Sequence, residues 1–178
     1  MKYKSFRKYT NLVVDGRLDE QVSLQELIDN FREVFPYAKA DCKIQHFRKE
    51  GEDTNDMICY GQVQSHRDKP PFYTVTVKFH RDDTELPFTI KNLGKVDCTC
   101  NAYRYNLIHP NKVNGNQAEP IPSYASISNT VRNPDKVPSV CKHLYAFLLF
   151  LHDKGIIKVF TNGWNLIWVS DCIRNTCI

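Results

Sequence analysis

The sequence DCTC at residues 97–100 places the thiols of Cys98 and Cys100 one residue apart. A disulfide between them would close a small strained ring, because disulfide geometry is narrow. In a β-strand, side chains two residues apart point to the same face of the sheet. The two sulfurs could therefore bind one tetrahedral metal ion at distances of roughly 2.3 Å. Two ligands leave such an ion incomplete, so the motif predicts two more elsewhere in the chain.

The sequence VCKH at residues 140–143 supplies them, because Cys141 and His143 repeat the one-residue spacing. Together the two motifs make a Cys₃His set with a gap of forty residues, which suits structural Zn²⁺. Two residues turn a helix by about 200°, so Cys141 and His143 cannot both be ligands in mid-helix. They fit where a loop becomes a helix, facing a strand end, and there the exposed N–H groups favour a thiolate. The alternative is a chance match of buried thiols and a capping histidine.

The two motifs, followed by the apolar stretch LYAFL, resemble the SWIM-type zinc finger over about residues 88–153. That family's pattern is Cys-x-Cys, a variable gap and Cys-x-His, on two strands that lead to a helix. The resemblance implies bound zinc and a role in binding DNA or protein, and it does not imply an enzyme. The forty-residue gap is longer than is usual in the family, which suggests an insertion in this chain. The pattern is also similar, more loosely, to small SWIM-like proteins of tailed bacteriophages, some of them particle components.

Composition indicates one real core, because the 178 residues are 42% apolar. The formal net charge of +4 permits an anionic partner without requiring one. The longest apolar run, residues 144–151, is far shorter than the ~20 residues of a membrane span. The N-terminus has no apolar segment of the kind found in secretory signals, so we expect no secretion by a signal peptide and an intracellular, reducing setting. The resemblance to phage proteins implies a virion or the host cytoplasm as the location.

Four cysteines lie outside the proposed cluster. Cys42 and Cys59 fall on neighbouring predicted strands, where core packing is favoured over a bridge or further ligands. Cys172 and Cys177 could be a free pair or a bridge, within the chain or between chains. His109 could replace one of the ligands, although a solvated turn residue is the simpler interpretation.

Local patterns predict the secondary structure around the motifs. Ser23 and Glu26 form a capping box at the start of an amphipathic helix that ends before Pro36. Period-two patterns between turn residues then predict an antiparallel meander with strands at 41–49, 56–65, 72–81 and 87–100. A buried helix is expected at about 139–154, and Asn162-Gly163 predicts a terminal hairpin.

We therefore predict an α+β fold in one domain: an antiparallel sheet with one covering helix, linked through zinc to a buried C-terminal helix and a β-hairpin. The expected parts are a basic arm (1–20), the helix and sheet (21–95), a SWIM-like zinc module (96–155) with an inserted loop (101–137), and a hairpin and tail (156–178).

Two functions are consistent with these features. The first is a non-enzymatic, zinc-stabilised assembly protein that contacts other subunits, as in the tail, baseplate or neck of a phage particle. The second is a DNA-binding accessory protein, because basic residues suit phosphate contacts and the aromatics of the arm suit base stacking. The candidate anion or partner contacts are Lys2, Lys4, Arg7, Lys8, Arg104, Lys112, Arg132 and Lys136. We expect no enzyme, because the chain has no Walker loop, no Gly-x-Ser-x-Gly and no complete kinase motif set.

Overall fold

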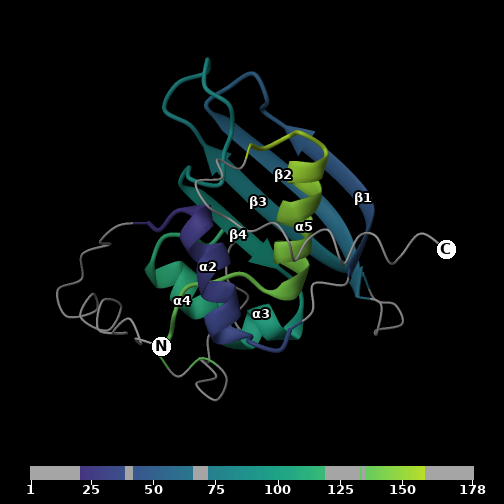
Figure 1. Cartoon of the computed structure of the whole chain (residues 1–178), viewed down its shortest axis with the longest axis vertical. Coiled ribbons are helices and arrows are strands. Elements are labelled where there is room, and N and C mark those ends of the chain that lie inside the picture. Colours follow the sequence, from purple (N-terminus) through teal and green to yellow (C-terminus); the bar gives the residue numbers. More distant parts are fainter. Residues whose placement is uncertain (1–20, 39–41, 66–71, 119–132, 134, 159–178) are drawn as a thin grey trace.

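A computed structural model describes residues 21–38, 42–65, 72–118, 133 and 135–158 of the chain. The expected basic arm, the C-terminal hairpin, Cys172 and Cys177 lie outside these residues. In the described part, a four-stranded antiparallel sheet carries one long helix across one face, and three further helices lie beside it (Figure 1). This arrangement confirms the predicted α+β class.

The sheet is a meander in the order β1 (Cys42–Glu50), β2 (Asp56–Ser65), β3 (Tyr73–His80) and β4 (Gly94–Cys98). All neighbouring strands are antiparallel, as the alternating patterns predicted. The fourth strand is shorter than the expected 87–100, because residues 89–92 form a turn. In this turn the backbone N–H of Thr89 donates to Asn92 Oδ1 at 2.7 Å, and the Asn92 N–H donates to the Thr89 carbonyl at 3.2 Å.

Helix α5 (Lys142–Asp153) covers the sheet and contacts all four strands. It packs on the face formed by Val75, Val77 and Phe79 of β3, which are all buried. Every residue of α5 except its last, Asp153, is buried or half-buried, in agreement with its apolar sequence. Gly155, at φ 69°, follows the helix.

Helix α2 (Leu24–Val34) begins at the predicted cap, where the backbone N–H of Glu26 donates to Ser23 Oγ at 3.2 Å. It lies beside α5 rather than across the strands, and Phe31 stacks on Tyr145 with ring centroids 4.8 Å apart. Its first turn packs against β4, where Leu24 lies directly over Gly94. The sheet is therefore covered mainly by α5, and α2 extends the same apolar layer.

The expected loop 101–137 starts with two short helices, α3 (Asn101–Asn106) and α4 (Ile108–Val113). Six residues are too few to show a helical period in the sequence, which explains why the pattern gave no sign of them. After α4, the chain returns to the sheet and pairs with the free side of β4: Val96 N–H donates to the Asn116 carbonyl at 2.7 Å, and Ala118 N–H to the Val96 carbonyl at 3.0 Å.

One apolar cluster joins these elements and includes residues from Val22 to Ile157. None of the helices in the described ranges is long and apolar enough to cross a membrane. The cluster contains the three sulfurs of the predicted metal site, so the site is built into the core and not appended to it.

Close packing between β2 and α5 depends on Gly61. A Cβ atom added there would overlap the ring of Phe147, which is fully buried. We expect Gly61→Ala to lower the free energy of unfolding by about 1–3 kcal/mol, because the ring must move in a filled core. Urea unfolding measures this change. Gln62→Ala, on the exposed face of the same strand, is the control. Equal urea midpoints of unfolding for the two variants would contradict the packing described.

Candidate metal centre

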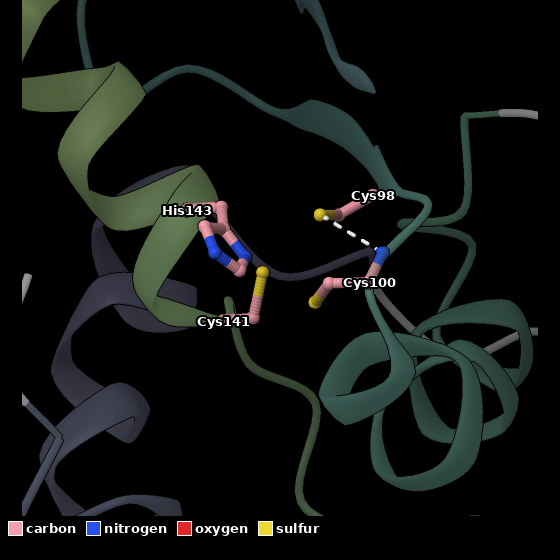
Figure 2. A group of neighbouring side chains, drawn as sticks. All are labelled: Cys98, Cys100, Cys141 and His143. Atoms are coloured by element: carbon pink, nitrogen blue, oxygen red, sulfur yellow. Dashed lines mark hydrogen bonds between the residues drawn. The ribbon is translucent and has the colours of Figure 1, made fainter. Parts of the chain in front are cut away.

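The four predicted ligands come from three elements that meet at one end of the sheet (Figure 2). Cys98 is the last residue of β4, and Cys100 is the residue that caps the N-terminus of α3. Cys141 caps the N-terminus of α5, and His143 is the second residue of that helix. The second pair therefore lies where a loop becomes a helix and faces a strand end, as the helical geometry predicted.

Geometry and burial suit a single ion. The three Sγ atoms and a nitrogen of His143 all lie within 4.8 Å of one another, and all four residues are buried. Sulfurs bound at roughly 2.3 Å to a tetrahedral ion lie about 3.8 Å apart, so small side-chain rotations would close the site on an ion. These four buried residues could therefore bind a metal ion.

The ring nitrogens of His143 give the clearest support for a ligand role. Its ring is 3% exposed, and neither Nδ1 nor Nε2 has a hydrogen-bond partner among the described residues. The ring packs against Tyr73 with centroids 4.4 Å apart, which fixes its position without satisfying either nitrogen. A buried polar group left without a partner costs roughly 1–3 kcal/mol. A metal bond to one nitrogen would remove much of that cost, so the imidazole fits the role of ligand.

The thiols influence one another electrostatically. Burial raises the pKa of Cys98 and of Cys141 well above the ordinary value for a thiol. Hydrogen bonds from the Cys141 and Cys98 thiols hold the pKa of Cys100 well below that value. The lowered pKa of Cys100 favours a thiolate at that sulfur, and a dication would displace protons from the other two, because thiolates are the binding form.

Backbone groups also point at the sulfurs. The N–H of Cys100 donates to Cys98 Sγ at 3.5 Å, and the N–H of Tyr103 donates to Cys100 Sγ at 3.4 Å. The turn between the two cysteines is tied to β3, because Thr99 and Thr74 exchange hydrogen bonds of 3.1 and 3.0 Å. These contacts orient the first pair of ligands and stabilise negative charge on them.

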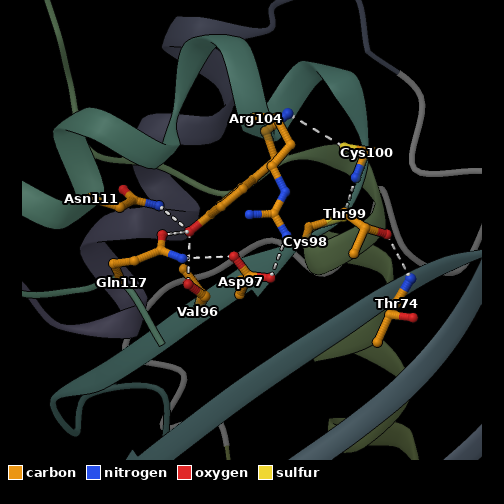
Figure 3. Close-up of polar contacts among 10 residues, drawn as sticks. Thr74, Val96, Asp97, Cys98, Thr99, Cys100, Arg104, Asn111 and Gln117 are labelled. Carbon is orange, nitrogen blue, oxygen red and sulfur yellow. Dashed lines mark hydrogen bonds and ion pairs between the residues drawn. The ribbon is translucent and has the colours of Figure 1, made fainter. Parts of the chain in front are cut away.

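A buried polar network surrounds this first pair (Figure 3). Asp97, next to Cys98, accepts hydrogen bonds from Arg104 at 3.1 Å and from Gln117 at 2.6 Å. The hydroxyl of Tyr103 lies 2.7 Å from both Gln117 Oε1 and the Val96 carbonyl. Both Asp97 and Arg104 are buried, so this ion pair is shielded from water.

Asn111 extends the network to the second pair of ligands. Its Nδ2 donates to the Tyr103 hydroxyl at 3.1 Å and to the Ser139 carbonyl at 2.9 Å. Its Oδ1 accepts the Ser139 N–H at 2.9 Å. Asn111 and Ser139 are fully buried, and Ser139 lies two residues before Cys141. Protein contacts alone therefore hold the two halves of the site in register.

The predicted partner contacts have different placements. Arg104 was expected to contact an anion, but it is buried and paired with Asp97, so it stabilises the site and is not on the surface. Lys112 and Lys136 are exposed. Lys2, Lys4, Arg7, Lys8 and Arg132 lie outside the described residues.

The other candidate ligands do not join the cluster. His109, on α4, is half-buried and is not part of the ligand group. Cys42 and Cys59 lie on β1 and β2, and they are not cross-strand partners, because Cys42 pairs with Ser65 and Cys59 with Lys49. Burial raises the pKa of Cys59 to about 12, as expected for a core thiol.

Comparison with family models, with curated proteins and with solved structures finds no match to this chain. The functional argument therefore depends on the residues themselves.

Asn111 gives a direct test of how the site is held. We expect Asn111→Ala to lower metal affinity by about 10–100-fold, because both halves of the site lose their common anchor. Competition with a chromophoric chelator measures the affinity. Asn114→Ala is the matched control, since Asn114 bonds only locally, to the Pro110 carbonyl at 2.9 Å. Equal affinities for both variants would show that Asn111 does not position the ligands.

Proposed function

We propose that this chain is a zinc-stabilised, non-enzymatic module that binds other proteins in an assembly. The observation that carries the proposal is the group of four buried ligands, three sulfurs and one imidazole, within 4.8 Å of one another. Thiolate and imidazole together favour Zn²⁺ over Mg²⁺ or Ca²⁺, which prefer oxygen ligands.

The ligand set supports a structural rather than a catalytic ion. A tetrahedral ion with four protein ligands has no free position for water or substrate, whereas catalytic zinc keeps one open. The ion would join β4, α3 and α5, and so connect the sheet to the helix that covers it. Structural zinc contributes roughly 10–16 kcal/mol of apparent binding energy in small finger peptides, which is large against a typical folding stability.

Apolar side chains on the surface support a protein partner. Tyr105 of α3 and Val113 of α4 are 47% and 37% exposed, and both belong to the segment that the SWIM resemblance identifies as inserted. Tyr37, after α2, is 95% exposed. Aromatic residues of this kind are enriched in protein interfaces. The narrower assignment to a phage particle depends on the resemblance alone and remains a prediction.

Metal analysis of the purified chain tests the proposal. We expect about one equivalent of zinc per chain, and we expect Cys98→Ser to lose it and to unfold at least about 3 kcal/mol more easily, because three ligands hold the ion poorly. Mass spectrometry of the metal and urea unfolding provide the two measurements. Cys42→Ser is the control, since Cys42 lies outside the cluster. A chain that is purified without metal, and whose free energy of unfolding changes neither with the two substitutions nor with chelators, would refute a structural zinc.

One observation favours DNA binding as a second candidate function. Lys112 and Lys136 are both exposed. The pKa of the His109 imidazole is lowered mainly by burial, and the positive charges of Lys136 and Lys112 lower it further. The three side chains therefore share a region of positive potential, which suits a phosphate backbone.

If DNA binds there, a gel-shift assay in dilute buffer should show a complex that weakens steeply as salt is added. The double variant Lys112→Glu, Lys136→Glu should lose the complex, because each substitution replaces attraction to phosphate with repulsion. Lys91→Glu, Lys95→Glu changes the same number of exposed charges elsewhere and should retain it. No shift of the unaltered chain at low salt would eliminate this function.

A further inference from the structure

The two edges of the sheet differ. The edge at β4 is covered by the chain's own residues 116–118, through the hydrogen bonds of Val96 with Asn116 and Ala118. The edge at β1 pairs with β2 on one side only, and no strand within the described ranges lies on its other side (Figure 1). An edge strand presents a row of backbone donors and acceptors from alternate residues, so within the described part of the chain the outer edge of β1 could accept a further strand.

We propose that β1 binds an extended, acidic segment of a partner protein, which adds to the sheet as a further strand beside it. This inference deepens the proposed function, because it names the surface and the chemistry of the partner. Strand addition of this kind takes affinity from main-chain hydrogen bonds and specificity from alternate side chains.

Charge on β1 selects the partner. The strand carries three cations, Lys43, Arg48 and Lys49, against one acid, Glu50. By the register with β2, Lys43 lies opposite Gln64 and Arg48 opposite Tyr60, on the face of the sheet away from α5. Arg48 also contacts Glu50 at 3.2 Å, but both side chains are largely exposed, so water weakens that pair. Carboxylates on an added strand would lie across from these cations.

The opposite face of β1 carries Lys49, which lies opposite Cys59, and two apolar side chains that are incompletely covered. Ile44 and Phe47 point toward α5 but remain half-buried, unlike the fully buried residues of β3 in the same layer. Phe47 contacts Phe150 of α5 edge-on, with ring centroids 5.5 Å apart, and Phe150 is half-buried too. Apolar residues on an added strand would cover these side chains, so the matching segment alternates acidic with apolar residues.

Two other occupants fit the charges poorly. A second copy pairing through β1 would bring together two strands that each carry three cations and one acid, and like charges across strands are destabilising. The chain's own stretches outside the described residues have no net negative charge: residues 1–20 carry five basic and three acidic residues, and residues 159–178 carry one of each. An acidic strand therefore comes from another protein.

The test uses the full-length, metal-loaded chain and a labelled nine-residue peptide that alternates glutamate with valine. Fluorescence anisotropy should show saturable binding that weakens with salt, and amide hydrogen exchange should show new protection in residues 43–50. Two peptide controls should fail to bind: one with lysine in place of glutamate, and one with N-methyl groups on alternate amides, which blocks strand pairing. An N-methylated peptide that binds as well as the parent would overturn strand addition.

Charge variants locate the site. Lys43→Glu combined with Arg48→Glu should weaken binding about tenfold, because both cations become repulsive. Lys91→Glu combined with Lys95→Glu changes as many exposed charges away from β1 and should leave binding intact. Three results would each overturn the proposal. They are an equal loss of binding in both variants, no binding by the unaltered chain, and full protection of the β1 amides before peptide is added. Zinc content is measured on the same samples. A chain that contains zinc but does not bind the peptide would therefore refute strand addition without refuting the structural zinc.

Discussion

Three thiols and one imidazole face one another inside this protein, at the place where β4, α3 and the sheet-covering helix α5 meet. Each of these groups is costly to bury alone. Burial raises the pKa of the Cys98 thiol and neighbouring thiols lower that of Cys100, and the imidazole has no hydrogen-bond partner among the described residues. A shared cation resolves both problems at once. Because the four ligands belong to the core that unites sheet and helices, the stability of the described fold and the occupancy of the site are linked quantities.

The surroundings of the site indicate that it is organised before any ion arrives. Asp97, Arg104, Gln117 and Tyr103 connect the strand end to α3, and the paired bonds of Asn111 with Ser139 connect α4 to the approach of α5. Small zinc domains that lack such contacts fold only with metal, because nothing else opposes the chain entropy. Here a sheet of four strands and a buried helix supply a core of their own, so a bound ion would act on a partly prepared structure.

The repeated one-residue spacing of the cysteines and histidine was sufficient to predict which side chains meet, since that spacing fits one strand end and one helix start. Alternating patterns likewise predicted β1, β2 and β3 closely, and Ser23 predicted the start of α2. The sequence could not predict the role of Arg104, because nothing local to a basic residue tells whether a carboxylate will lie beside it in the fold. Nor could it predict α3 and α4, since six-residue helices are fixed by caps and tertiary contacts and not by periodicity.

The anchoring of the segment between β4 and α5 has a consequence for variation in length. Residues 116–118 are paired with β4, and the chain is held again at Asn133, whose side chain binds the Asn106 carbonyl at 3.0 Å and the Val137 N–H at 2.9 Å. Lengthening a closed loop is cheap, about 0.6 kcal/mol for each doubling. Related sequences could therefore gain or lose many residues between positions 118 and 133 while the four ligands keep their geometry, which would let new recognition elements evolve there without disturbing the core.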